Sequence, residues 1–263
     1  VYEGKEQWAS LDFEYYTPKE LYDIMRAGNR ILTTQVPTDE FERVFGKYLE
    51  EGFDLVYIGC SLKQSSSVNT GTVVAKKLLE SYPDAKIFCI DSLNACIGEG
   101  MLAMKAAGLR DEGLDAQTIH EKILAMRNTV NEFVTVHSLD CLKRAGRVKA
   151  SSAFFGNLFG VKPILIADAE GYQSAFKKVK GRQGSLQEVV SLMKENIVNP
   201  EEQCIYIVHA DCAEEAGQLR EMVEKEIPCK STYTTFIGPI IGASVGPDTI
   251  GLYAFGKEVT YRG

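Results

Sequence analysis

In the first half of the chain, short runs of apolar residues alternate with stretches in which the apolar residues fall on one face of a helix. The sequence DLVYIGCSLKQSSSVNTGTVVAKKLL, residues 54–79, predicts a buried strand, a polar loop and a helix. Residues 86–91 predict a second buried strand, which leads into a helix over residues 94–109. This alternation of strands and helices predicts parallel strand pairing with right-handed crossovers.

Helix signals flank this region. Thr17-Pro18-Lys19-Glu20 combines an N-cap hydroxyl, a proline and a glutamate three residues after the cap, which predicts a helix that ends near Gly28. Residues 39–51 predict another helix with Gly52 as its stop, and Asp115 is expected to cap a helix that runs to about residue 129.

The second half of the chain has a different rhythm, with more strands and a hairpin. Strands are expected at residues 133–137, 161–167, 172–179, 204–209, 230–236 and 249–255, and helices at 139–143, 185–197 and 213–226. The third of these helices follows a strand, and the second opens with a capping box at Ser185. Residues 238–247 read as an apolar turn bounded by glycines.

The change of rhythm predicts an α/β fold with two domains. The first domain covers residues 1–130 and has a mainly parallel sheet, and the second covers residues 131–263 and has a mixed sheet. Ligand sites in such sheets gather at the carboxyl ends of the strands, where the polar loop before residue 68 and Asp91-Ser92 both fall.

The composition narrows the choice of partners. A net charge of −7 over 263 residues argues against nucleic acid as the main partner, and no apolar run is long enough for a membrane span. The sequence therefore predicts a cytoplasmic protein without stable membrane insertion. Seven scattered cysteines without a C-x-x-C pair and three isolated histidines predict neither disulfides nor a metal site.

The serine loop, residues 60–67, carries the clearest candidate chemistry. A strand that feeds a hydroxyl-rich loop and then a helix leaves backbone N–H groups and the positive end of a helix dipole at one place. Such a place binds anions. The loop lacks the glycines and lysine of a polyphosphate site, so a carboxylate or a single oxyanion suits it better. The same hydroxyls are also ordinary turn and cap residues.

Several motifs occur together in the order typical of one family. They are Thr33-Thr34-Gln35, Ser65-Ser66-Ser67-Val68-Asn69, Ile90-Asp91-Ser92, the basic stretch from Ser138 to Arg147, Val161-Lys162-Pro163-Ile164-Leu165, and Ile237-Gly238-Pro239 through Gly246-Pro247. In these motifs the chain resembles the DegV family of bacterial fatty-acid-binding proteins.

This resemblance implies an EDD fold and a lipid-binding protein that holds one long-chain fatty acid in an apolar ligand tunnel between the two domains or beside them. The protein would present the acid to a fatty acid kinase for phospholipid synthesis and would itself need no cofactor. The implied carboxylate contacts are Thr33 and Ser65, with Thr34, Ser66 and Ser244 beside them. The implied tunnel residues are Phe154, Phe155, Leu158, Phe159, Ile240 and Ile241, and the residues implied for docking the kinase are Lys143, Arg144, Arg147 and Arg182.

The chain differs from the family pattern at three places. The family's opening strand and the loop after it would precede the point at which Val1 aligns, Ser66 replaces a glycine, and Ser244 stands where many members have histidine. A different class of function also remains open, an enzyme that acts on a small anionic substrate at the serine loop, such as a phosphoryl or acyl transferase. Cys60 is its candidate nucleophile, but no histidine lies near it in sequence.

Overall fold

The structure is a computed structural model that describes residues 1–10, 12–151, 154 and 160–263. Its packing divides the chain into two compact units. One unit is Thr34–Asn128, and the other joins Val1–Thr33 to Thr129–Gly263. The sequence predicted a single boundary near residue 130, whereas the packing groups the first 33 residues with the second half of the chain.

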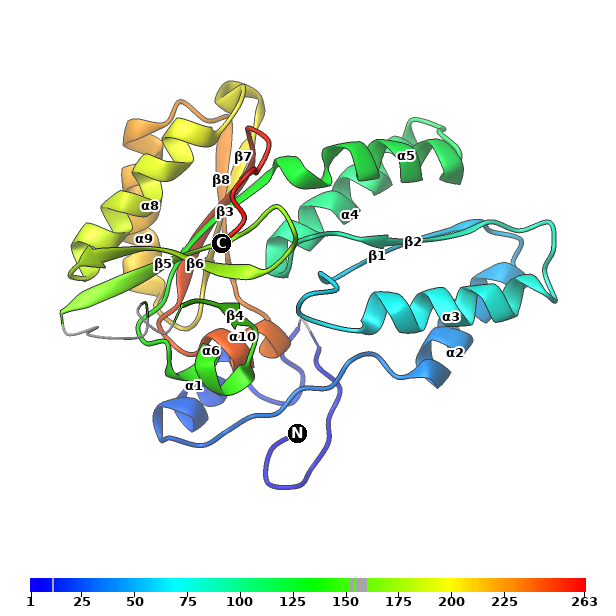
Figure 1. The fold of residues 1–263 in the computed structure, drawn as a ribbon, viewed down its shortest axis with the longest axis horizontal. Helices are drawn as coiled ribbons and strands as arrows, with labels where there is room; N and C mark the ends of the chain where they lie inside the picture. The colour runs from blue at the N-terminus through cyan, green and yellow to red at the C-terminus, as the bar shows by residue number, and fades with distance from the viewer. Residues whose placement is uncertain (11, 152–153, 155–159) are drawn as a thin grey trace. The chain divides into compact units, whose positions relative to one another are not determined.

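The unit Thr34–Asn128 is a small sheet between two pairs of helices. Strands β1 and β2 pair in parallel, with Leu55 opposite Ile87, which confirms the predicted parallel arrangement. Helices α2 and α3 lie on one side of these strands, and α4 and α5 lie on the other (Figure 1). The bounds are α2 Thr38–Glu50, β1 Leu55–Gly59, α3 Ser67–Leu79, β2 Ile87–Asp91, α4 Cys96–Asp111 and α5 Ala116–Met126.

Aromatic packing fixes α2 against the sheet. The ring of Phe41 meets the rings of Phe45 and Tyr57 edge to face, with centroids 5.4 and 5.1 Å apart. Gly71 lets α3 approach the same ring, since a Cβ there would lie 3.0 Å from Phe41. This cluster holds the strand that leads into the serine loop.

The other unit is built on a mixed sheet. Its described strands number seven, in the order β4-β6-β5-β3-β9-β7-β8. Strands β5 and β6 form the predicted antiparallel hairpin, β9 pairs antiparallel with β3 and β7, and β8 pairs in parallel with β7. The bounds are β3 Val130–Thr135, β4 Val148–Lys149, β5 Val161–Ala167, β6 Gln173–Lys180, β7 Cys204–His209, β8 Ser231–Phe236 and β9 Ile250–Phe255.

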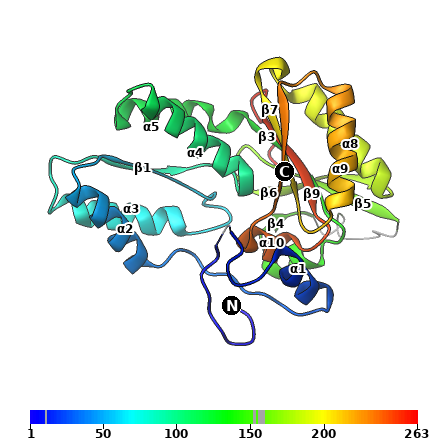
Figure 2. The ribbon, with the colours of Figure 1, turned by 180° about the vertical axis from the view of Figure 1, so that it is seen from behind.

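Helices α8, Arg182–Asn196, and α9, Ala213–Glu226, cover one face of this sheet (Figures 1 and 2). They bury a continuous apolar core that includes Leu186, Val190 and Leu219. Three shorter helices gather near one another away from that face, namely α1 Pro18–Arg26, α6 Asp140–Ala145 and α10 Pro239–Val245 (Figure 1).

Local structure differs from the sequence prediction at three places. Helix α8 begins after Gly181, which has a φ of 70°, so Ser185 lies inside the helix and donates to the carbonyl of Arg182 instead of capping. Residues 239–245 form helix α10, where a turn was predicted, because Pro239 stands at a first helical position. Strand β3 starts at Val130 and ends at Thr135, earlier than the predicted 133–137.

Helix α1 joins the start of the chain to its last helix. Tyr22 is fully buried, and its hydroxyl donates to the carbonyl of Ile237 at 2.8 Å. A Cβ on Gly242 would collide with that hydroxyl, so only glycine allows this approach. Arg26 adds ion pairs to Asp211 at 2.6 Å and to Asp248 at 2.7 Å. These contacts explain why residues 1–33 pack with the second half.

Replacing Gly242 with alanine is expected to destabilise the protein by about 1–3 kcal/mol, because the added methyl group overpacks a buried contact with Tyr22. Gly217→Ala is the matched control, since a Cβ there meets no atom within 4 Å and alanine favours a helix interior. Urea denaturation checks both variants. Equal stability of the Gly242→Ala variant and the parent would contradict the tight contact between Gly242 and Tyr22.

Candidate functional site

The serine loop connects the end of β1 to the start of α3, and its hydroxyls bond to one another. The Oγ of Ser65 accepts from the backbone N–H of Ser67 at 3.2 Å and lies 2.9 Å from the Oγ of Ser67. The Oγ of Ser67 also accepts from the backbone N–H of Val36 at 3.2 Å. Ser66 is exposed at the N-cap of α3, and its side chain makes no capping hydrogen bond.

This pattern leaves donor capacity at the loop. Ser65 and Ser67 bring two hydroxyl protons, and the bond between the two oxygens uses one of them. Among the described residues, the other proton has no hydrogen-bond acceptor, while the backbone N–H groups of Val36 and Ser67 already donate to the two oxygens. An acceptor such as a carboxylate can take that proton, and the positive end of α3 favours a negative charge there.

The Thr33-Thr34-Gln35 motif leads directly to this loop. Gln35 donates from Nε2 to the Oγ1 of Thr70 at 3.2 Å, and Val36 makes the bond to Ser67 given above. Thr34 is exposed and belongs to the same unit as the serine loop. Thr33 is half-buried and is the last residue of the Val1–Thr33 segment of the other unit.

The predicted gathering of polar groups at the carboxyl ends of β1 and β2 is confirmed. The carboxylate of Asp91 accepts from the backbone N–H groups of Leu62 at 3.2 Å and Leu93 at 3.0 Å. Ser92 is fully buried and donates to the carbonyl of Asn94 at 3.0 Å. These contacts give Asp91 and Ser92 a supporting role, since they hold the two loops together.

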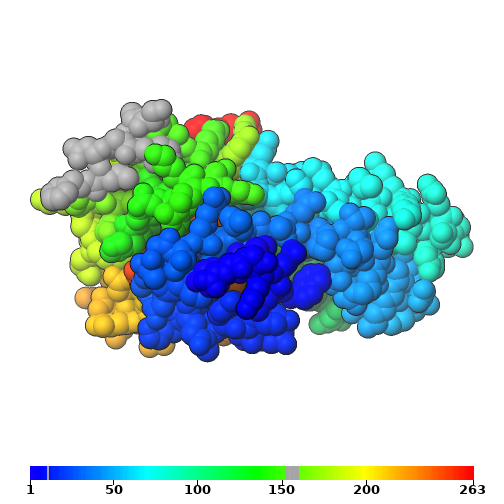
Figure 3. Space-filling view, turned by 90° about the horizontal axis from the view of Figure 1, so that it is seen from below, coloured from blue at the N-terminus to red at the C-terminus, as the bar shows by residue number. Residues whose placement is uncertain are grey.

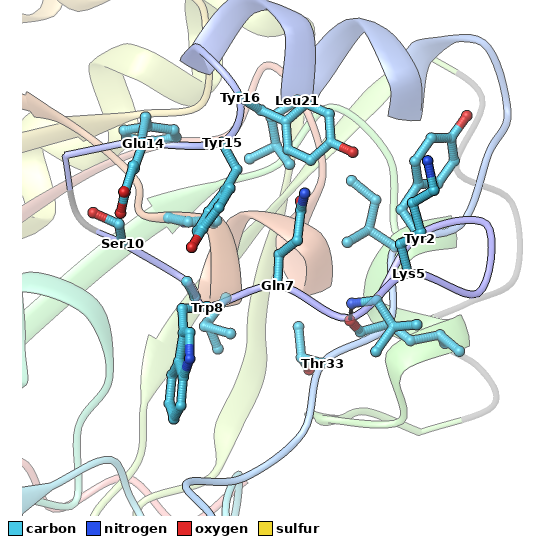
Figure 4. Close-up of a pocket in the computed structure, with 17 residues that line it drawn as sticks. Tyr2, Lys5, Gln7, Trp8, Ser10, Glu14, Tyr15, Tyr16, Leu21 and Thr33 are labelled. Atoms are coloured by element: carbon cyan, nitrogen blue, oxygen red, sulfur yellow. Dashed lines mark hydrogen bonds between the residues drawn. The ribbon is translucent and has the colours of Figure 1, made fainter. Parts of the chain in front are cut away.

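Residues at the start of the chain line an apolar pocket. These residues form part of the surface in Figure 3. Its empty volume is about 580 Å³, including the open mouth. Figure 4 draws Tyr15, Tyr16, Leu21 and Thr33 around it, and Trp8 is 61% exposed at its edge. Ile240 of α10 also lines it.

A polar pocket lies in the same unit and shares Ile31, Leu32 and Thr33 with the apolar pocket. Its empty volume, including the open mouth, is about 630 Å³. It brings Ser244 of α10 together with Thr33. Three arginines, Arg30, Arg144 and Arg147, line it as well. Ile31–Thr33 therefore borders an apolar and a cationic environment.

The remaining predicted residues lie elsewhere. Phe154 is half-buried beneath the ammonium of Lys178, 5.0 Å from its ring centroid, and Ile241 is half-buried on α10. Phe155, Leu158 and Phe159 are outside the described residues. Lys143 is exposed, whereas Arg182 pairs with Glu215 at 2.7 Å and donates to the carbonyl of Asp248 at 2.7 Å.

Two buried carboxyl groups have shifted ionisation. Burial raises the pKa of Glu99, in the first turn of α4, to about 7. Burial also raises the pKa of Glu132, on β3, to about 7, although Gln173 donates to its Oε1 at 2.6 Å. The pKa of the Tyr57 phenol is raised by burial first and by the nearby Glu99 second. All three groups therefore tend to stay neutral.

Two kinds of structural feature are absent from the described part of the chain. It contains no group of three or more His, Cys, Asp and Glu side chains arranged to hold a metal ion. None of its helices has both the length and the apolar character needed to cross a bilayer.

The fold defines an α/β protein with two units, and comparison with known proteins gives its family. Residues 9–257 match a family model described as an uncharacterised protein of the DegV family. A DegV domain-containing protein of Clostridium perfringens is 35% identical over 240 residues, which are 91% of this chain and 82% of that protein. The chain therefore belongs to the DegV family.

Solved structures of the same fold include proteins described by their lipid ligands. A DegV family protein from Thermus thermophilus, described by its fatty acid binding, is 25% identical with a TM-score of 0.86, over 97% of this chain and 89% of that one. A stearic acid-binding protein from Eubacterium ventriosum is 27% identical with a TM-score of 0.79, over 95% and 89% of the two chains.

Sequence reasoning missed several residues that line these pockets. Arg30 stands alone in sequence, apart from the basic stretch that ends at Arg147, so no local pattern indicated it. The sequence pattern predicted no helix in residues 1–16. Their aromatic content was the available signal, since five aromatic side chains there line the apolar pocket, namely Tyr2, Trp8, Phe13, Tyr15 and Tyr16.

The raised pKa of Glu132 predicts that the protein becomes less stable as the pH rises. In the unfolded chain this carboxyl loses its proton near its usual value of 4.5, but in the folded chain only near 7. The contribution of Glu132 to the free energy of unfolding is therefore complete below pH 4.5 and is lost as the pH rises towards 7. Glu132→Gln keeps the side chain neutral at both pH values. The free energy of unfolding of this variant, relative to that of the parent, is therefore expected to be about 1–3 kcal/mol higher at pH 8 than at pH 4.5.

Denaturant unfolding at the two pH values measures this difference. The exposed Glu221→Gln on α9 removes the same charge from the surface and is expected to leave the pH dependence of the parent unchanged. A Glu132→Gln curve parallel to that of the parent would contradict the shifted pKa.

Proposed function

We propose that this chain binds a long-chain fatty acid, with the carboxylate held by hydroxyl groups and the acyl chain in apolar surroundings. The observation that carries the proposal is that Ile31–Thr33 lines both an apolar, aromatic-walled pocket and a polar pocket. An amphiphile needs these two environments side by side. The relatives from Thermus thermophilus and Eubacterium ventriosum, described as fatty acid binders, support the choice of amphiphile.

Hydroxyl donors are proposed to hold the carboxylate. Thr33 and Ser65 carry this role by the family pattern, and Thr34, Ser66 and Ser244 are its proposed neighbours. The spare proton of the Ser65–Ser67 pair supports it, because hydrogen bonds to a charged acceptor are about twice as strong as neutral ones. A desolvated carboxylate needs several such donors, since its burial is otherwise unfavourable.

The acyl chain is proposed to lie against apolar side chains. Burying each methylene contributes about 0.8 kcal/mol, so most of the affinity comes from the chain and little from the head group. Ile240 already lines an apolar pocket with Leu21 and Tyr15. Ile241, Phe154, Phe155, Leu158 and Phe159 keep their proposed role as tunnel residues.

We further propose a binding protein, rather than an enzyme, that works in the cytoplasm and presents the acid to a fatty acid kinase for phospholipid synthesis. Lys143, Arg144 and Arg147 support a docking role because all three are exposed near the end of α6. Exposed charges of this kind mainly steer association. Arg182 is included in the docking proposal, with its carboxylate partner Glu215 as a competing contact.

Replacing Thr33 by valine and Ser65 by alanine together is expected to weaken fatty acid binding by about 2–4 kcal/mol, because each change removes a charge-assisted hydrogen bond. Titration of stearate measures the loss, and native mass spectrometry of the gently purified parent protein shows whether an acyl chain co-purifies.

The matched control is Thr260→Val with Ser81→Ala, which removes the same two hydroxyls from exposed positions. It is expected to bind stearate like the parent. Unchanged affinity in the Thr33 and Ser65 double variant would place the head group elsewhere. If the parent neither carries an acyl chain nor gains thermal stability with fatty acids, the proposed function is wrong.

A further inference from the structure

One edge of the large mixed sheet has no neighbouring strand in the described part of the chain. Strand β8 is the last strand of that sheet, and it pairs on one side with β7. An edge strand exposes backbone N–H and C=O groups to which another strand can bind. The free edge of β8 is therefore a surface for association, and fatty acid binding does not use it.

The hydrogen bonding between β8 and β7 fixes which backbone groups lie at this free edge. The N–H of Ile237, directly after β8, donates to the carbonyl of His209 at 2.8 Å. Successive residues of a strand direct their backbone groups to opposite sides, so the odd-numbered residues of β8 direct theirs towards β7. The residues that direct their N–H and C=O groups away from the sheet are consequently Thr232, Thr234 and Phe236.

Strand β8 lacks the features with which proteins usually protect an edge strand. Its six residues include no charged residue and no proline, and its register with β7 is continuous from Cys204 to His209. On the opposite side of the sheet, β4 is two residues long and β6 carries Lys177, Lys178 and Lys180. Short strands and lysines hinder pairing between edges, so β8 is the edge that remains able to pair.

Aromatic side chains are exposed along β8. Tyr233 is 56% exposed and Phe236 is 40% exposed. The ring of Tyr206 on β7 packs near that of Tyr233, and the ring of Phe13 packs near that of Phe236, with centroids 6.1 Å apart in both pairs. Tyrosine and phenylalanine are enriched in interfaces between proteins. These rings therefore add apolar contact area to the backbone groups of the edge.

We infer that β8 pairs with the β8 of a second copy of this chain, antiparallel and about a two-fold axis that passes through Thr234. Such an axis brings the outward backbone groups of each strand opposite those of the other. Thr234 then lies opposite its own equivalent, and Phe236 lies opposite Thr232 of the second copy. Tyr233 lies opposite Thr235 of the second copy.

The side chains of β8 favour a copy of this chain over an unrelated extended segment. In the antiparallel register both aromatic rings of each strand lie opposite a threonine of the other, and pairs of an aromatic and a β-branched residue stabilise a sheet. The two-fold contact also closes after two copies. The outer edges of the joined sheet are then the protected sides that carry β4 and β6.

Sedimentation velocity of the full chain at a series of concentrations measures this association. A dimer is expected to form as the concentration rises. Tyr233→Lys is expected to raise the dissociation constant about tenfold or more, because it replaces a ring by a charge at the edge. Thr234→Pro removes an outward N–H and is expected to abolish the dimer.

The matched control is Tyr48→Lys, which changes an exposed tyrosine on α2 of the other unit and is expected to dimerise as the parent does. Circular dichroism shows whether each variant is folded. If Thr234→Pro does not fold, Tyr233→Lys decides the test.

Cysteine crosslinking tests the register. The double variant Tyr233→Cys with Thr235→Cys is expected to give a covalent dimer on mild oxidation. Opposed Cα atoms of antiparallel strands lie about 4.5–5.5 Å apart, within the range of a disulfide. Either substitution alone is expected to give no more covalent dimer than the parent, whose seven cysteines are all partly buried, because neither residue lies opposite itself.

Three results would overturn the inference. The first is a parent that stays monomeric at every concentration, which would leave the edge of β8 to a strand of another protein. The second is a dimer that Tyr233→Lys leaves unchanged, since another surface would then hold the copies together. The third is a double cysteine variant that forms no more covalent dimer than its single variants. All three readouts are independent of fatty acid binding.

Discussion

One buried hydrogen bond determines where the start of the chain lies. The hydroxyl of Tyr22 donates to the carbonyl of Ile237, and Gly242 leaves the space for it. Helix α1 is therefore held against α10, and the segment that follows α1 passes both α10 and α6. Both pockets depend on this placement, because Ile31–Thr33 lines each of them.

The two pockets differ because their other walls come from chemically different segments. The opening residues supply tyrosine and tryptophan rings to one, and the carbonyl end of α6 supplies Arg144 and Arg147 to the other. Rings bury apolar area, and arginines gather where a helix ends in carbonyl groups. The difference in polarity between the two pockets, which share Thr33, thus arises from local features of separate segments of the chain.

The serine loop shows how a structural motif retains binding capacity. Its hydroxyls support the first turn of α3 and the segment after Thr34, as ordinary turn residues do. Because two hydroxyls share one bond, that support does not use every proton. The structural and the ligand-binding interpretations of Ser65 are therefore compatible, and family membership favours the second without removing the first.

The sequence alone determined the local elements and the family. Strand β5, strand β7 and helix α9 lie where the apolar pattern predicted them, and the capping box at Thr17 is present, because these signals act over a few residues. The capping box predicted at Ser185 was wrong, since Gly181 starts α8 earlier. Only the tertiary structure decided that residues 1–33 pack with the second half and that Arg30 joins Arg144 and Ser244 in one pocket. Such neighbours are set by contacts such as that of Tyr22 with Ile237, between residues more than 200 positions apart, and no local pattern records them.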